Sequence, residues 1–177
     1  MNAQGIVTKV LSFFLLVMFQ VLVLKNFTIA GYAYCYVYVA FLIWLPVNMD
    51  KAIQMLLALL LGLSVDLFYS TIGLHASAAV LMAFLREPVL KLVKPTMGYE
   101  QGVGPSMKEF GFIWFARYVA VAILPHHILL FSLSAGNQVF IAAAMLKALV
   151  TVICTTFFIL SIEQFEVIYY SSRRRRR

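Results

Sequence analysis

Long apolar runs separated by short polar turns are the main pattern along the chain. The runs cover residues 6–24, 29–45, 52–69, 74–92, 110–133 and 138–165. The breaks between them contain turn-forming residues, as in Pro46-Val47-Asn48 and Ser70-Thr71-Ile72-Gly73. Only residues 93–109 are long enough, and rich enough in proline and glycine, to form a loop. Since one bilayer crossing takes roughly 20 apolar residues, the pattern predicts one transmembrane domain over residues 1–177, an all-α bundle of six helices.

The composition excludes a soluble domain. Of the 177 residues, 63% are hydrophobic and 12% are charged, and the mean hydropathy is +0.94. Soluble domains have roughly 45–50% apolar and about 25% charged residues. We therefore expect an integral membrane protein whose apolar side chains face lipid as well as one another.

Basic residues are distributed unevenly between the two ends of the predicted bundle. With six spans, the two termini, the turn at 46–51 and the loop at 93–109 share one side of the membrane. That side collects Lys9, Lys51, Arg86, Lys91, Lys94, Lys108 and the last five residues, whereas the other side has only Lys25. Cytoplasmic loops are enriched in Lys and Arg, so both termini are predicted to be cytoplasmic.

The net charge of +7 belongs mainly to the carboxyl-terminal tail, residues 169–177, which ends in Arg173, Arg174, Arg175, Arg176 and Arg177. A basic run next to a membrane span attracts anionic lipid. An acidic cytoplasmic partner is the alternative, and nucleic acid is not expected because no aromatic platform accompanies the run. Further basic contacts on the cytoplasmic side are predicted for Arg86, Lys91 and Lys94.

A few ionisable residues lie inside the predicted spans, where each needs a partner or a purpose because a charge is costly in lipid. From a rise of about 1.5 Å per residue, we expect them to meet in the outer half of the membrane. They are Asp66, His75, His126, His127 and Lys147. Two interpretations remain open. The first is an Asp66–Lys147 ion pair that locks the bundle, with the histidines as hydrogen-bonding groups, and the second is a polar pocket for a ligand or partner.

The sequence contains no motif for catalysis, phosphate binding or metal coordination. Adjacent residues on a helix, such as His126 and His127, diverge by about 100°, so they are not expected to hold one metal ion. We therefore predict a protein that is not an enzyme and has no metal or other cofactor.

Three motifs in the middle of the chain resemble a known membrane-protein family. They are Gly62-Leu63-Ser64-Val65-Asp66-Leu67-Phe68, Gly73-Leu74-His75-Ala76 and Leu81-Met82-Ala83-Phe84-Leu85-Arg86. The later stretch with Gly98-Tyr99-Glu100, Pro105-Ser106 and residues 115–131 is similar to the Bacteroidetes members of that family. The family is MreD, the rod-shape-determining membrane proteins of bacteria.

Resemblance to MreD implies a subunit of the machinery that elongates the bacterial cell wall, in the cytoplasmic membrane. Its expected role is to scaffold MreC, the glycosyltransferase RodA and a class B penicillin-binding transpeptidase, and to help couple them to MreB filaments for control of cell shape. The resemblance also implies a six-helix fold similar to the substrate-binding subunits (S components) of energy-coupling-factor (ECF) transporters. Because those subunits hold ligands in an outward-facing pocket, the alternative function is a binding subunit for a small polar metabolite.

Overall fold

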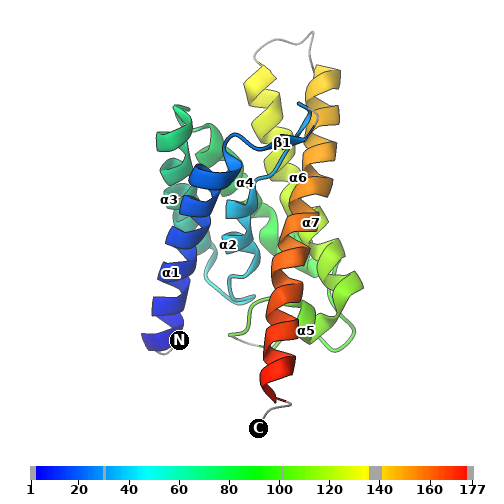
Figure 1. Cartoon of the computed structure of the whole chain (residues 1–177). Coiled ribbons are helices and arrows are strands. Elements are labelled where there is room, and N and C mark those ends of the chain that lie inside the picture. The colour runs from blue at the N-terminus through cyan, green and yellow to red at the C-terminus, as the bar shows by residue number, and fades with distance from the viewer. Residues whose placement is uncertain (1–2, 30, 101, 136–140, 175–177) are drawn as a thin grey trace.

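The computed structural model describes residues 3–29, 31–100, 102–135 and 141–174, which form a mostly helical bundle (Figure 1). The long helices are α1 (Ala3–Phe19), α3 (Lys51–Tyr69), α4 (Leu74–Leu92), α6 (Phe112–Ala135) and α7 (Ile141–Arg174). The shorter elements are η1 (Gln20–Leu24), β1 (Thr28–Ile29), β2 (Ala33–Tyr34), η2 (Val37–Val39), α2 (Ala40–Ile43) and α5 (Met107–Phe110). The start of α1 and the end of α7 lie at the same end of the bundle.

Four segments of the described chain are long and apolar enough to cross a membrane. They are Gly5–Leu24, which joins α1 to the π-helical turn η1, then α3, α6 and Ala142–Ile168 of α7. Their outward faces are apolar, and the side chains of Leu22, Leu67 and Ile153 are 77%, 81% and 70% exposed. Such faces are unfavourable in water and suited to lipid. This surface is compatible with a multi-pass membrane protein.

The second predicted span, residues 29–45, is not a long helix. The chain turns at Gly31, where φ is +72°, and β1 pairs with β2 in a short antiparallel hairpin. It continues through η2, a short 3₁₀ turn, and α2, a single α-helical turn, and every residue from Cys35 to Ile43 is buried. Tyrosine at every second position from Tyr32 to Tyr38 has the period of an extended chain, not the 3.6-residue period of a helix. We call residues 33–45 the inner segment.

Side chains of the surrounding helices satisfy the backbone of the inner segment. The Oγ1 atom of Thr155, on α7, accepts a hydrogen bond from the N–H of Tyr36 at 3.1 Å. Gln20, on η1, donates to the carbonyl of Cys35 at 3.0 Å and accepts from the N–H of Tyr38 at 3.4 Å. Non-helical backbone is tolerated at membrane depth only where protein groups satisfy it. This requirement explains why Gln20 and Thr155 interrupt otherwise apolar helices.

Arg86, on α4, anchors the other end of the inner segment. Its side chain is 1% exposed. Its five N–H groups donate to the carbonyls of Ile43, Leu45 and Pro46, to Oε1 of Gln54 and to the hydroxyl of Tyr118. The prediction that Arg86 makes a surface contact on the cytoplasmic side is therefore wrong. The carbonyls that follow α2 have no helical partner and draw the guanidinium into the interior.

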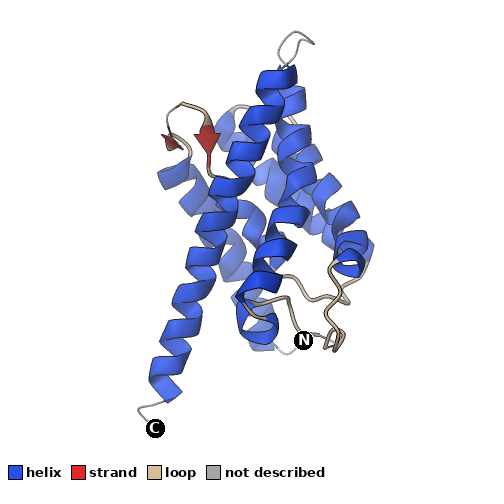
Figure 2. Cartoon of the chain, turned by 90° about the vertical axis from the view of Figure 1, so that its right-hand side faces the viewer, coloured by secondary structure: helices blue, strands red, loops and turns tan. Residues whose placement is uncertain are grey.

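Lys91, in the last turn of α4, and Lys94, in the loop that follows this helix, are exposed. Figure 2 shows loops at the end of the bundle where the chain begins. Nζ of Lys91 is 2.6 Å from Oε1 of Glu87, one helical turn earlier. In the tail, α7 includes Arg173 and ends at Arg174. The last three residues, Arg175, Arg176 and Arg177, lie outside the described residues. Contacts of these basic residues with lipid or a partner stay a prediction.

Helices α3 and α4 approach each other closely at Gly62. A Cβ atom at this position would lie 2.3 Å from the Cα of Ala76. No side chain fits there without moving one helix away from the other. Close packing of this kind relies on small residues, as is common between membrane helices.

Candidate functional site

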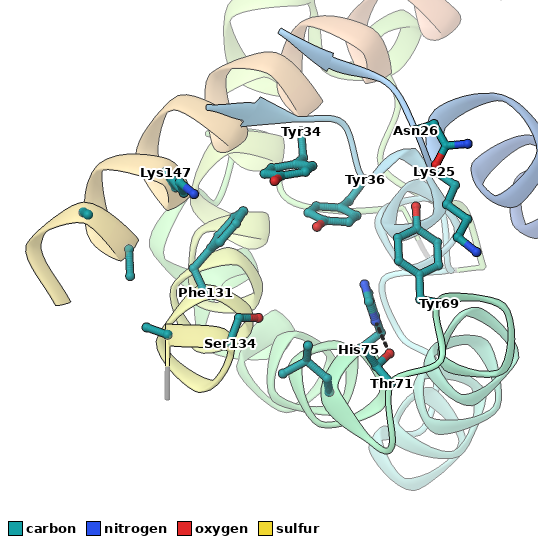
Figure 3. A pocket seen from close by; sticks show the side chains of 14 residues that line it. Lys25, Asn26, Tyr34, Tyr36, Tyr69, Thr71, His75, Phe131, Ser134 and Lys147 are labelled. Carbon is teal, nitrogen blue, oxygen red and sulfur yellow. Dashed lines mark hydrogen bonds between the residues drawn. The ribbon is translucent and has the colours of Figure 1, made fainter. Parts of the chain in front are cut away.

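A cavity of about 540 Å³ opens at the end of the bundle opposite the termini. Its walls come from β2 and the start of the inner segment and from the adjoining ends of α3, α4, α6 and α7 (Figure 3). The side chains that face it include Tyr34, Tyr36, Tyr69, His75, Phe131 and Lys147. Lys25 and Asn26 form part of its exposed edge, whereas Tyr36 and His75 are buried.

Asp66 and His75 form the polar floor beside this cavity. The Asp66 carboxylate accepts hydrogen bonds from the N–H groups of His75 and Ala76, both at 3.0 Å, and from Oγ1 of Thr71 at 2.5 Å. These N–H groups belong to the first turn of α4, and Gly73, the residue before that helix, has no side chain to cap it. Asp66, on the preceding helix, therefore caps the N-terminus of α4. The dipole of α4 also favours a negative charge at this end.

The same carboxylate orients the His75 ring. Oδ1 of Asp66 is 3.0 Å from Nδ1 of His75, so Nδ1 carries the hydrogen that is donated to the carboxylate. Nε2 of His75 has no hydrogen-bond partner among the described residues, although the residue is only 2% exposed. In Figure 3 the unpaired side of the ring points toward the open space between Tyr36 and Tyr69. A buried polar atom without a hydrogen bond is unfavourable, so this nitrogen is available to bind a group that enters the cavity.

His126 and His127, on α6, lie behind the cavity wall and are both fully buried. Nε2 of His126 is 2.7 Å from the hydroxyl of Tyr38. Nδ1 of His127 donates to the carbonyl of Ile123 at 2.8 Å, and its Nε2 is 3.2 Å from Oγ1 of Thr155. Both rings also contact the ring of Tyr36, which separates them from the cavity. Their role in the structure is to support the inner segment.

Asp66 and Lys147 do not form the predicted ion pair. Asp66 is occupied by donors from the α3–α4 turn and the start of α4, among them the ring of His75. Lys147 faces the cavity instead, with Nζ 5.9 Å from the centroid of the Tyr32 ring, and it makes no ion pair within the described chain. The free N–H groups of α4 lie nine and ten residues from Asp66 along the chain, so they capture the carboxylate locally.

Of the five residues expected to converge, His75 and Lys147 line the cavity, Asp66 supports its floor, and the two adjacent histidines lie behind it. Sequence reasoning missed the aromatic wall, because Tyr34 and Tyr36 were assigned to a helical span. The period-two alternation of these tyrosines was the available signal. Lys25 was a second signal, as the only basic residue predicted for that side of the membrane.

Family models, curated proteins and solved structures were compared with the chain. None of them matches. The resemblance to MreD and to the ECF binding subunits therefore rests on the motifs quoted above, and a proposal about function must be argued from those residues and their contacts.

Proposed function

We propose that the chain is a non-enzymatic membrane subunit of the MreD type. In this role it binds MreC, RodA and a class B penicillin-binding transpeptidase in the bacterial cytoplasmic membrane. It also helps to couple these proteins to MreB filaments, so that wall synthesis follows the cell axis and sustains a rod shape.

The observation that carries the proposal is the use of the motif residues inside the bundle. Gly62 permits the close approach of α3 and α4, Asp66 caps α4, and Arg86 holds the inner segment. An enzyme needs reactive groups directed at a substrate, whereas these groups are directed at other parts of the same chain. His75 differs from them, because its Nε2 atom is left unpaired beside the cavity. The motif residues thus stabilise the bundle itself, as expected of a scaffold.

We infer six membrane crossings with both termini in the cytoplasm, as in the ECF binding subunits. The second crossing is then made by the inner segment and the fourth by α4, although neither is among the four long apolar segments. An even number of crossings is favoured by the positions of the α1 start and the α7 end, which lie at one end of the bundle. Lys9, Lys51 and Lys94 are predicted for that end too, and basic residues favour the cytoplasmic side.

Helix α1 is the surface that we assign to a partner helix such as the membrane-spanning segment of MreC. It packs on the bundle by a narrow strip only, so that just 17% of the most apolar stretch of Gly5–Leu24 is buried. Phe14 and Leu15 are 59% and 67% exposed, and Leu11 beside them is 56% exposed. A second apolar helix can pack along this exposed face without displacing any part of the bundle.

Co-purification from cells that express MreC tests the proposal. Tagged full-length chain should retain MreC in mild detergent, and a Phe14→Ala, Leu15→Ala double variant should retain several-fold less. The matched control is Leu56→Ala, Leu67→Ala on α3, where both side chains are exposed, and it should leave the recovery of MreC unchanged. Depletion of the chain should make rod-shaped cells round. Normal cell shape after depletion, together with recovery of a transporter ATPase in place of MreC, would reject the scaffold role.

A further inference from the structure

The cavity that opens opposite the termini has a positive lining. Lys25 and Lys147 are both among its lining residues, Lys25 at its edge beside Tyr69, and its described lining residues include no Asp or Glu (Figure 3). Nζ of Lys25 donates to the carbonyl of Phe68 at 2.5 Å and lies 5.6 Å from the centroid of the Tyr69 ring, which leaves two of its three N–H groups available. Neither ammonium group has a carboxylate partner in the part of the chain that is described. The one carboxylate nearby, that of Asp66, lies behind the floor and is already occupied by donors from Thr71, His75 and Ala76. Two lysines without a carboxylate partner at one cavity favour a negatively charged occupant.

Open hydrogen-bonding groups lie between these two charges. Nε2 of His75 is unpaired and its ring is fixed by Asp66. In the neutral ring, with its hydrogen on Nδ1, Nε2 is an acceptor. A bound anion and the Asp66 carboxylate together stabilise the imidazolium, so the ring takes up a proton with the anion and Nε2 then donates to it. The hydroxyl of Tyr69 accepts a hydrogen bond from Gln20 at 2.9 Å, so its own hydrogen remains to be donated. Both groups suit the oxygen atoms of a carboxylate or phosphate.

The remaining walls are aromatic. The rings of Tyr34 and Tyr36 are nearly parallel, with centroids 6.1 Å apart and an interplanar angle of 16°. Phe131 lies 5.8 Å from Tyr34 and 6.3 Å from Tyr36, measured between ring centroids. These faces suit a flat apolar group. The volume of about 540 Å³ is within the range of roughly 300–1,000 Å³ that is usual for small-molecule sites.

We propose that this cavity binds a small organic anion, with a carboxylate or phosphate group and a flat apolar body. Lys25 and Lys147 balance its charge, His75 and Tyr69 donate to its oxygen atoms, and Tyr34, Tyr36 and Phe131 contact the body. The site adds ligand binding to the scaffold and does not depend on the scaffold role, since its residues lie at the end of the bundle opposite the termini.

Binding of defined probes to the purified full-length chain tests this site. Benzoate and phenyl phosphate present the two anionic groups on the same flat ring, and benzamide is the uncharged match. Isothermal titration calorimetry in detergent should show binding of at least one of the two anions, and no measurable heat with benzamide. Equal affinity for benzamide and benzoate, or no binding of either anion, would overturn the proposal.

Lysine variants locate the binding. Loss of one charge-assisted contact weakens affinity by about tenfold or more, so Lys147→Met and Lys25→Met should each have this effect, and Lys147→Arg should retain most of the affinity. Lys91→Met is the matched control, because Lys91 is exposed at the other end of α4, and it should bind as the unaltered chain does. Unchanged binding in the Lys25→Met, Lys147→Met double variant would overturn the assignment even if the anion binds.

A lipid phosphate could supply the same chemistry as a soluble anion, and nanodiscs separate the two sources. Phenyl phosphate or benzoate should bind with similar affinity in discs of phosphatidylcholine alone and in discs that contain phosphatidylglycerol. Binding that is abolished by phosphatidylglycerol would instead show that a lipid headgroup occupies the cavity, and it would refute a soluble ligand. Neither result depends on MreC, so failure of the site and failure of the scaffold role are distinguishable.

Discussion

Substitution of Arg86 tests whether the guanidinium group holds the inner segment in the bundle. Arg86→Met removes the donors of the Leu45 carbonyl and of Oε1 of Gln54. The carbonyls of Ile43 and Pro46 each lose one donor and keep another, the hydroxyl of Tyr118 and the N–H of Met49. A buried acceptor left without a donor costs about 1–3 kcal/mol. Part of this loss is offset, because methionine also removes a buried charge that forms no ion pair within the described residues. We expect the free energy of unfolding to fall by about 3–5 kcal/mol.

Arg86→Lys separates the effect of the charge from that of the planar donor fork. An ammonium group has three N–H donors where the guanidinium has five, so at least two of the five hydrogen bonds are lost. At about 1 kcal/mol for each bond, the variant should be less stable by about 2 kcal/mol. Lysine is therefore expected to fall between arginine and methionine.

Equilibrium unfolding in mixed micelles, followed by tryptophan fluorescence, measures these differences. Trp44 is a suitable reporter because it belongs to the inner segment, and its indole N–H donates to Oε2 of Glu163 at 2.9 Å. Lys91→Met, at an exposed position of the same helix, should change stability by less than about 0.5 kcal/mol. An Arg86→Lys variant as stable as this control, or an Arg86→Met variant more stable than the unaltered chain, would show that Arg86 does not hold the inner segment in place.

Two further substitutions probe the packing and the hydrogen bonds of the bundle. Gly62→Ala places a methyl group 2.3 Å from the Cα of Ala76, so α3 and α4 must separate, and a loss of about 1–3 kcal/mol is expected in the same unfolding assay. Thr155→Val removes the acceptor of the Tyr36 N–H at nearly constant volume. It should cost about 1–3 kcal/mol and speed up hydrogen exchange of the Tyr36 amide.

Each of these substitutions has a matched control. Ser64 lies two residues after Gly62 on α3. Ser64→Ala removes only a local hydrogen bond to the carbonyl of Leu60, so it should change stability little. Thr156 is the residue next to Thr155, and the Oγ1 atom of Thr156 has no partner among the described residues. In Thr156→Val the Tyr36 amide should therefore exchange at its normal rate. Equal effects of Thr155→Val and Thr156→Val would contradict the assigned role of Thr155.

The apolar pattern was sufficient to predict where most long helices lie. Helix α4 occupies Leu74–Leu92 and α3 occupies Lys51–Tyr69, within one residue of the apolar runs at 74–92 and 52–69. The inner segment was predicted as a helix because its residues are apolar. An apolar run indicates that the residues are buried, but it does not determine their backbone conformation. Its conformation depends on Gln20 and Thr155, which lie far away along the chain and whose role cannot be read from the local sequence.

Some residues of the site were predictable from the sequence, but their pairing was not. Polar residues in apolar spans did identify His75, Asp66 and Lys147 as residues of one region. Opposite charges suggested a bond between Asp66 and Lys147, whereas the free N–H groups of α4 proved to be the better partner for the carboxylate. Arg86 was placed on the surface for a similar reason. A charged residue suggests solvent, and the carbonyls that bind its guanidinium group in the interior come together only once the chain has folded.

The hydrogen bonds of the inner segment constrain the order in which the protein can be assembled. The N–H of Tyr36 reaches its acceptor on Thr155 across a separation of 119 residues. During synthesis, residues 33–45 leave the ribosome long before α7 exists, and an extended backbone without partners is not stable in lipid. The segment must therefore wait at the membrane surface, or as a temporary helix, and take its final place only when the last helix inserts.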